Sequence, residues 1–180
     1  MRHQSTKKLV LAALFLALAY LLPFLTGQIP EIGSMLLPMH LPVLICGFVC
    51  GWPYGLAVGF AAPLLRSLTL GMPPLFPSAV AMAFELAAYG FFTGVCYRKL
   101  PKKALYLYAD LLIAMVAGRV VWGAAMIVIM GVKGGAFTWS AFLSGALLGA
   151  IPGIVLQLVL VPAIVALLQK AKMIPSGAAR

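Results

Sequence analysis

Three clusters of basic residues divide this 180-residue chain into long apolar stretches that are almost free of charge. The chain is 64% hydrophobic and only 9% charged, which makes it far more apolar than a soluble domain of this length. The stretches are long enough to cross a bilayer as helices. The sequence therefore predicts an all-α integral membrane protein. The clusters hold ten of the thirteen Lys and Arg residues: Arg2, Lys7 and Lys8; Arg98, Lys99, Lys102 and Lys103; Lys170, Lys172 and Arg180.

The positions of the clusters predict the topology. Basic segments that flank membrane spans stay on the cytoplasmic side, because they are translocated poorly. Both termini and the central basic loop are therefore expected in the cytoplasm. Four spans between the first two clusters and two between the second and third satisfy this condition. We predict one membrane domain, residues 1–180, as a compact bundle of six transmembrane helices over about residues 9–25, 40–51, 54–70, 76–97, 105–130 and 140–168.

Proline and glycine mark the expected breaks between these helices. The segment Gly51–Gly55 contains Pro53, and Pro73 with Pro74 cannot continue a helix. Pro152 and Pro162 are expected to kink the last span. Small residues also recur four apart, as in the series Gly47, Gly51, Gly55 and Gly59, and such ridges let helices approach closely in lipid.

Two charges lie deep within predicted spans and need an explanation other than topology. At about 1.5 Å of rise per residue, Glu85 and Arg119 lie roughly 17 and 21 Å from the cytoplasmic boundary, on consecutive helices. An isolated charge at that depth costs a few kcal/mol or more, so each should face the bundle interior, a partner or a wet cavity. They either pair to join two helices or hold a polar substrate, and the two roles are compatible.

Four further residues are candidates for substrate binding, each with a competing structural role. Arg66 lies near an outer helix end, where it can instead extend to lipid headgroups. His40 begins a predicted helix and can be a capping or packing residue. Trp122 and Trp139 can stack on an aromatic ligand or form an interfacial belt. Asp110 is expected to complement the N-terminal dipole of its helix.

Several chemistries are not supported by the sequence. The three cysteines, Cys46, Cys50 and Cys96, all lie in apolar stretches and are expected to be small core residues rather than disulfide or metal ligands. No metal or other cofactor is predicted. There is no Walker-type phosphate loop and no zinc-protease motif. The chain is therefore not expected to be an enzyme, and ATP-driven transport would need a separate motor.

The chain resembles the substrate-binding S components of energy-coupling factor (ECF) transporters, which import vitamins and related micronutrients in prokaryotes. The resemblance rests on the small size, the predicted six helices, the pattern Ala13-Leu-Phe-Leu-Ala17, and the segments Pro38–Gly51 and Tyr54–Gly59. It covers nearly the whole chain. It implies a binding subunit of an ABC importer in the prokaryotic plasma membrane, loaded from outside through a cavity in the outer halves of the later helices.

The resemblance also implies partners. Ala13 and Ala17 would contact an ECF transmembrane coupling subunit, and two cytoplasmic ATPase subunits would drive uptake. The substrate residues do not follow from the family and remain Glu85, Arg119, Arg66, His40, Trp122 and Trp139. A pyridoxine-like substrate is weakly favoured over a riboflavin-like or deazapurine-type compound. The alternatives are a membrane-embedded enzyme that uses Glu85 and Arg119, and a structural membrane subunit with a dry interior.

Overall fold

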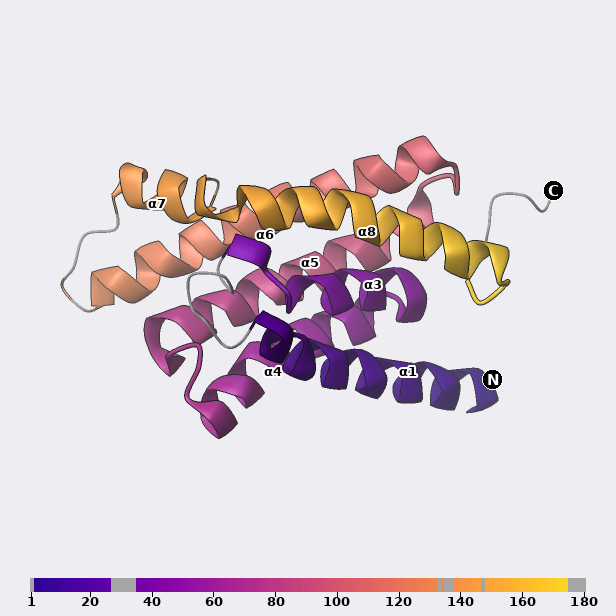
Figure 1. Ribbon diagram of the computed structural model, residues 1–180, viewed down its shortest axis with the longest axis horizontal. Helices are drawn as coiled ribbons and strands as arrows, with labels where there is room; N and C mark the ends of the chain where they lie inside the picture. The colour runs from indigo at the N-terminus through magenta and orange to yellow at the C-terminus, as the bar shows by residue number, and fades with distance from the viewer. Residues whose placement is uncertain (1, 27–34, 133, 135–137, 147, 175–180) are drawn as a thin grey trace.

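The computed structural model describes residues 2–26, 35–132, 134, 138–146 and 148–174. All regular structure in these ranges is helical (Figure 1). The elements are α1 (Arg2–Leu21), η1 (Leu22–Thr26), α3 (His40–Cys50), α4 (Trp52–Leu70), η2 (Leu75–Ala79), α5 (Val80–Lys99), α6 (Ala104–Val132), α7 (Trp139–Ala146), η3 (Leu148–Ala150) and α8 (Ile151–Lys170).

Four helical segments are long and apolar enough to cross a membrane: Thr6–Leu25, Leu75–Lys99, Ala104–Val132 and Ile151–Lys170. The other two predicted spans correspond to α3 and α4. With 11 residues, α3 rises only about 16 Å, roughly half of a hydrocarbon core of about 30 Å. These four segments support a multi-pass membrane protein. A total of six spans stays a prediction.

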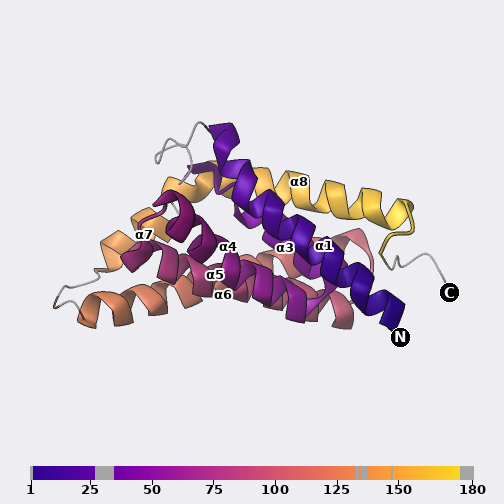
Figure 2. The same cartoon turned by 90° about the horizontal axis from the view of Figure 1, so that it is seen from below.

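The described residues of the basic clusters lie at one end of the bundle. Figures 1 and 2 both place the N-terminus, the connection between α5 and α6, and the C-terminal end of α8 at the same end. This arrangement requires the chain to return to that end between clusters, as the charge pattern predicts.

Helix α5 is central and packs against α3, α4 and α6. Helices α4 and α5 approach closely, because a Cβ on Gly55 or on Gly90 would overlap the other residue's backbone. Part of the predicted glycine ridge is therefore an interhelical contact. The core beside it contains fully buried Leu44, Leu86 and Leu111.

The last predicted span is not one continuous helix. The prediction of a single helix over residues 140–168 was wrong, because α7 ends at Ala146 and α8 begins at Ile151 after a short 3-10 segment. Pro152 occupies the first turn of α8, where its missing N–H is tolerated, but it cannot extend α7. The first helix also differs: it begins at Arg2 and becomes a 3-10 segment at Leu22, beside Pro23, which lacks a backbone donor.

Candidate functional site

Glu85 is the centre of a polar cluster buried within the bundle. Its side chain is 2% exposed, and its Oε1 lies 2.8 Å from Nη1 of Arg119 on α6. Tyr89, one turn further along α5, donates its hydroxyl to the same Oε1 at 3.1 Å. Nε2 of His40 lies 3.7 Å from it. The two deep charges found in the sequence thus form an ion pair that joins α5 to α6.

The local sequence fixes this geometry. Glu85 and Tyr89 are four residues apart and so share one face of α5. A Cβ on Gly118 would overlap the Tyr89 ring, so the ring packs directly on the α6 backbone. His40 is the first residue of α3, and its ring centroid lies 5.4 Å from that of Tyr89. Three helices therefore meet at the cluster.

Part of the cluster's hydrogen-bonding capacity is unused within the protein. Nη2 of Arg119 is buried and has no protein hydrogen-bond partner, and the same holds for both ring nitrogens of His40. A buried donor or acceptor left unpaired costs about 1–3 kcal/mol, and more when the group is charged. The cluster therefore has two side chains equipped to bind a polar molecule.

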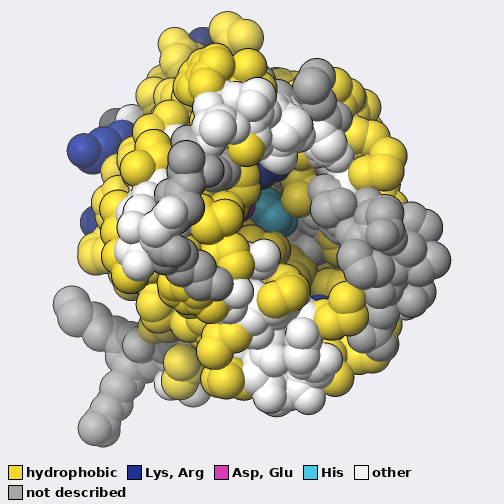
Figure 3. Space-filling view, turned by 90° about the vertical axis from the view of Figure 1, so that its left-hand side faces the viewer, with side chains coloured by type: hydrophobic (Ala, Val, Ile, Leu, Met, Phe, Trp, Pro, Cys, Tyr) yellow, Lys and Arg dark blue, Asp and Glu magenta, His cyan; other side chains and the backbone are white. Residues whose placement is uncertain are grey.

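The cluster lies beneath an opening at the end of the bundle opposite the basic clusters. Figure 3 looks onto this end and shows a hollow with a histidine side chain at its floor, next to a cationic one. The chain has two histidines, and His3 belongs to the first turn of α1 at the other end. His40 is the histidine of the buried cluster, and its side chain is 1% exposed.

Aromatic side chains from α6 and α7 pack together near the same end. Trp122 follows Arg119 by one turn of α6, and its ring centroid lies 6.2 Å from that of Phe142. Phe142 also stacks on Trp139, with 5.2 Å between the ring centroids and 21° between the ring planes. Trp139 itself is 71% exposed. Sequence reasoning selected both tryptophans but missed Phe142, although the Trp139–Phe142 spacing of three residues was a usable signal.

Arg66 lies elsewhere. It is 3% exposed, its Nη1 donates to the backbone carbonyl of Tyr20 at 2.8 Å, and its guanidinium lies 5.0 Å from the Phe24 ring centroid. These contacts attach α4 to the end of α1. The structure therefore brings Arg66 to the first helix, and none of its described contacts is with Glu85.

Replacing Arg66 with Met is expected to destabilise the bundle. The carbonyl of Tyr20 lies where α1 gives way to the 3-10 segment, so losing its donor should cost about 1–3 kcal/mol of unfolding free energy. Denaturation in detergent, followed by circular dichroism, measures the change. Arg66→Lys should recover part of it, because Lys keeps the charge but not the planar contact with Phe24. Unchanged stability together with lost ligand binding would instead assign Arg66 to the substrate site.

Two other buried polar residues lie outside the cluster's described contacts. Asp110 was expected to complement a helix dipole, but that interpretation was wrong: α6 begins at Ala104 and has no acid in its first turn, where the dipole acts. Asp110 is buried and neither carboxylate oxygen has a protein hydrogen-bond partner. Gln157 on α8, which sequence reasoning missed, is also buried, and neither its Nε2 nor its Oε1 has a protein hydrogen-bond partner. Among the described residues, no group of His, Cys, Asp and Glu is suited to hold a metal ion.

The helices and their four membrane-crossing segments define a multi-pass α-helical membrane protein with a charged cluster enclosed beneath one end. A family model described as "ECF transporter, substrate-specific component" matches residues 7–165, most of the chain. The chain belongs to this family, the substrate-binding membrane subunits of ECF transporters, which confirms the resemblance drawn from the sequence. The comparison with curated proteins finds no match, and neither does the comparison with solved structures.

Family membership also indicates the general role of the chain and the kind of subunits it works with. The chain is a transport protein that binds a small-molecule substrate, and the family works with ECF transmembrane and ATPase subunits. A substrate-binding transporter subunit is not typically an enzyme.

Proposed function

We propose that this S component captures a water-soluble micronutrient at the cluster of Glu85, Arg119, His40 and Tyr89 and presents it for ATP-driven uptake. The observation that carries the proposal is the set of buried, unpaired nitrogens on Arg119 and His40 beneath the opening of Figure 3. A purely structural ion pair would not need unpaired nitrogens of this kind. The cluster is the substrate site under this proposal.

The contacts define what such a substrate must offer. Arg119 donates through Nη2, while Nη1 is already committed to Glu85. His40 presents one donor and one acceptor when neutral. A small ring with hydroxyl groups and a ring nitrogen meets these requirements, which favours a pyridoxine-like compound. Riboflavin-like and deazapurine-type compounds remain candidates, with Trp122 or Trp139 as stacking partners.

The topology fits this direction of transport. Basic segments stay in the cytoplasm, so the end with the three clusters would face the cytoplasm of a prokaryotic cell. The hollow at the opposite end would then open to the outside. Six spans, formed by α1, α3, α4, α5, α6 and the broken pair α7–α8, return both termini to the cytoplasm.

The partner contact is proposed on α1. Ala13 and Ala17 are both exposed on this helix, four residues apart and therefore on one face. Small side chains at this spacing let another transmembrane helix approach closely. An ECF transmembrane coupling subunit would pack here, and two cytoplasmic ATPase subunits would supply the energy that this chain, lacking a Walker motif, does not.

The molecule retained after gentle purification tests the proposal directly. We expect mass spectrometry to find a micronutrient bound to the wild-type chain, and the same compound to raise the unfolding temperature of the emptied protein. A ligand at 100 times its Kd stabilises by about 2.7 kcal/mol, so the shift should be readily measured. A panel with pyridoxine-like, riboflavin-like and deazapurine-type compounds identifies the class. If none shifts the transition and no molecule co-purifies, the binding role is wrong.

A further inference from the structure

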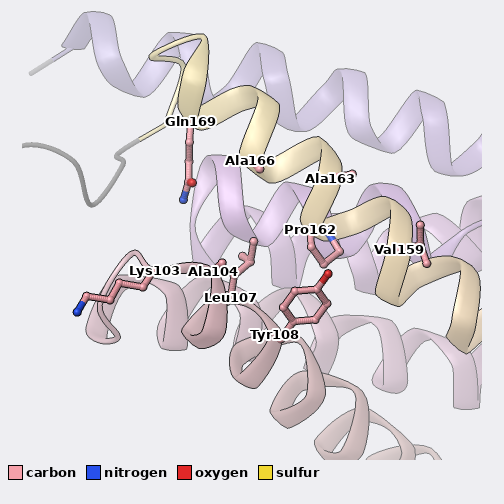
Figure 4. Close-up of a pocket in the computed structure, with 9 residues that line it drawn as sticks. All are labelled: Lys103, Ala104, Leu107, Tyr108, Val159, Pro162, Ala163, Ala166 and Gln169. Carbon is pink, nitrogen blue, oxygen red and sulfur yellow. The ribbon is translucent and has the colours of Figure 1, made fainter.

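A half-open groove separates α6 from α8 near the end that carries the basic clusters. Its volume is about 290 Å³, and Figure 4 shows residues of both helices facing it. Three of its lining residues are alanines, and three are polar: Ala104, Ala163 and Ala166; Lys103, Tyr108 and Gln169. None of its lining residues is acidic.

The sequence of α8 explains why the groove stays open. Val161 and Val165 are fully buried and anchor one face of α8 in the core. Ala163 and Ala166 lie off that face, are exposed, and are too small to reach α6. Helix α8 therefore packs through a buried face that includes these valines, and the space beside its alanines is unfilled by the described side chains.

The cationic end of the groove is Lys103. Its neighbour Lys102 is already engaged, because its Nζ lies 4.1 Å from the Tyr97 ring centroid and donates to the Leu100 carbonyl at 3.1 Å. Burial lowers the pKa of Lys102, an effect that Asp110 opposes. Figure 4 shows Lys103 extending away from the helices at the end of the groove, and Gln169 extending from α8 toward α6.

The dimensions of the groove match one leaflet of a bilayer. Its lining residues on α8 run from Val159 to Gln169, a rise of about 15 Å, which is half of a hydrocarbon core of about 30 Å. Lys103 precedes the first residue of α6 and so lies at the end of the apolar span. Pockets that enclose drug-sized ligands measure about 300–1,000 Å³. A half-open groove of about 290 Å³, just below this range, fits part of a longer molecule.

We propose that the groove binds one acyl chain of an anionic phospholipid, with the headgroup phosphate held by Lys103. The apolar wall takes the chain and the cationic end takes the phosphate. Anionic lipids are attracted to Lys and Arg next to a membrane span, and exposed Lys170 and Lys172 add positive charge beyond the end of α8. This site is separate from the Glu85 cluster, and its test does not depend on the substrate.

Native mass spectrometry of the full chain tests the site, with phosphatidylglycerol and phosphatidylcholine of identical acyl chains as probes. The wild type should retain phosphatidylglycerol in preference to phosphatidylcholine. Filling the groove with Ala163→Leu and Ala166→Leu should reduce retention of both lipids. Lys103→Gln should leave chain binding but lower the preference for phosphatidylglycerol about fivefold, the factor expected for one Lys near a charged headgroup.

Two matched variants serve as controls. Ala57→Leu makes one such substitution at an exposed alanine on α4, and Lys7→Gln removes one charge from the N-terminal cluster. Both should retain lipids as the wild type does. The proposal is overturned if the groove-filled variant keeps its phosphatidylglycerol, or if Lys7→Gln lowers the preference as much as Lys103→Gln. Unchanged lipid retention combined with lost assembly with a coupling subunit would show that the groove receives a protein.

Discussion

Replacing Arg119 with Met is expected to lower the free energy of unfolding by about 3–5 kcal/mol, the cost of leaving one partner of a buried ion pair uncompensated. The Glu85 carboxylate would keep the Tyr89 hydroxyl but lose its cation 2.8 Å away. Denaturation in detergent measures the loss. Val120→Met is the matched control, because Val120 is the next residue of α6 and is largely exposed. Its effect should stay within about 0.5 kcal/mol, as is usual for surface substitutions.

The double variant Glu85→Gln/Arg119→Met separates a structural ion pair from a substrate site. Removing both charges should restore much of the stability, because neither remains buried alone. Substrate binding should nevertheless stay lost, since the double variant lacks the free Nη2 of Arg119. A double variant that regains stability and binds the micronutrient like the wild type would make the pair purely structural. Turnover of a substrate that is abolished by Glu85→Gln alone would favour the enzyme alternative.

Glu85 and Arg119 could be brought together from the sequence because helix geometry carries the argument. The rise per residue is nearly constant, so counting from a basic cluster gives depth. Charges in a bilayer are costly, so two charged side chains at similar depth on consecutive helices are expected to face the bundle interior, a partner or a wet cavity. These two facts made a pair one of the two roles predicted from the sequence, and the structure shows the contact. Tyr89 joins the cluster through its spacing of four residues from Glu85.

Other features of the structure depend on tertiary packing that local sequence does not encode. Nothing near Arg66 indicates that it binds the carbonyl of Tyr20, 46 residues earlier. Gln157 is uncharged, so it leaves little signal in an apolar segment, although it is fully buried. The break between α7 and α8 was visible as Pro152, but the proline alone does not distinguish a kink from an interruption.

Introducing bulk at Ala13 and Ala17 is expected to abolish uptake while leaving substrate binding intact. Both alanines are exposed on α1 and lie outside the Glu85 cluster, so Ala13→Trp/Ala17→Trp should not disturb the site. Overpacking a close interface costs about 1–3 kcal/mol or more, which weakens assembly with the coupling subunit about 5- to 150-fold. Uptake in cells, co-purification of the ATPase subunits and the ligand-induced thermal shift are measured on the same variant. Leu18→Trp adds bulk to an exposed position about 100° or more around the helix from both alanines and should retain uptake. If the double tryptophan variant still assembles and transports, the coupling subunit docks on another surface of this chain.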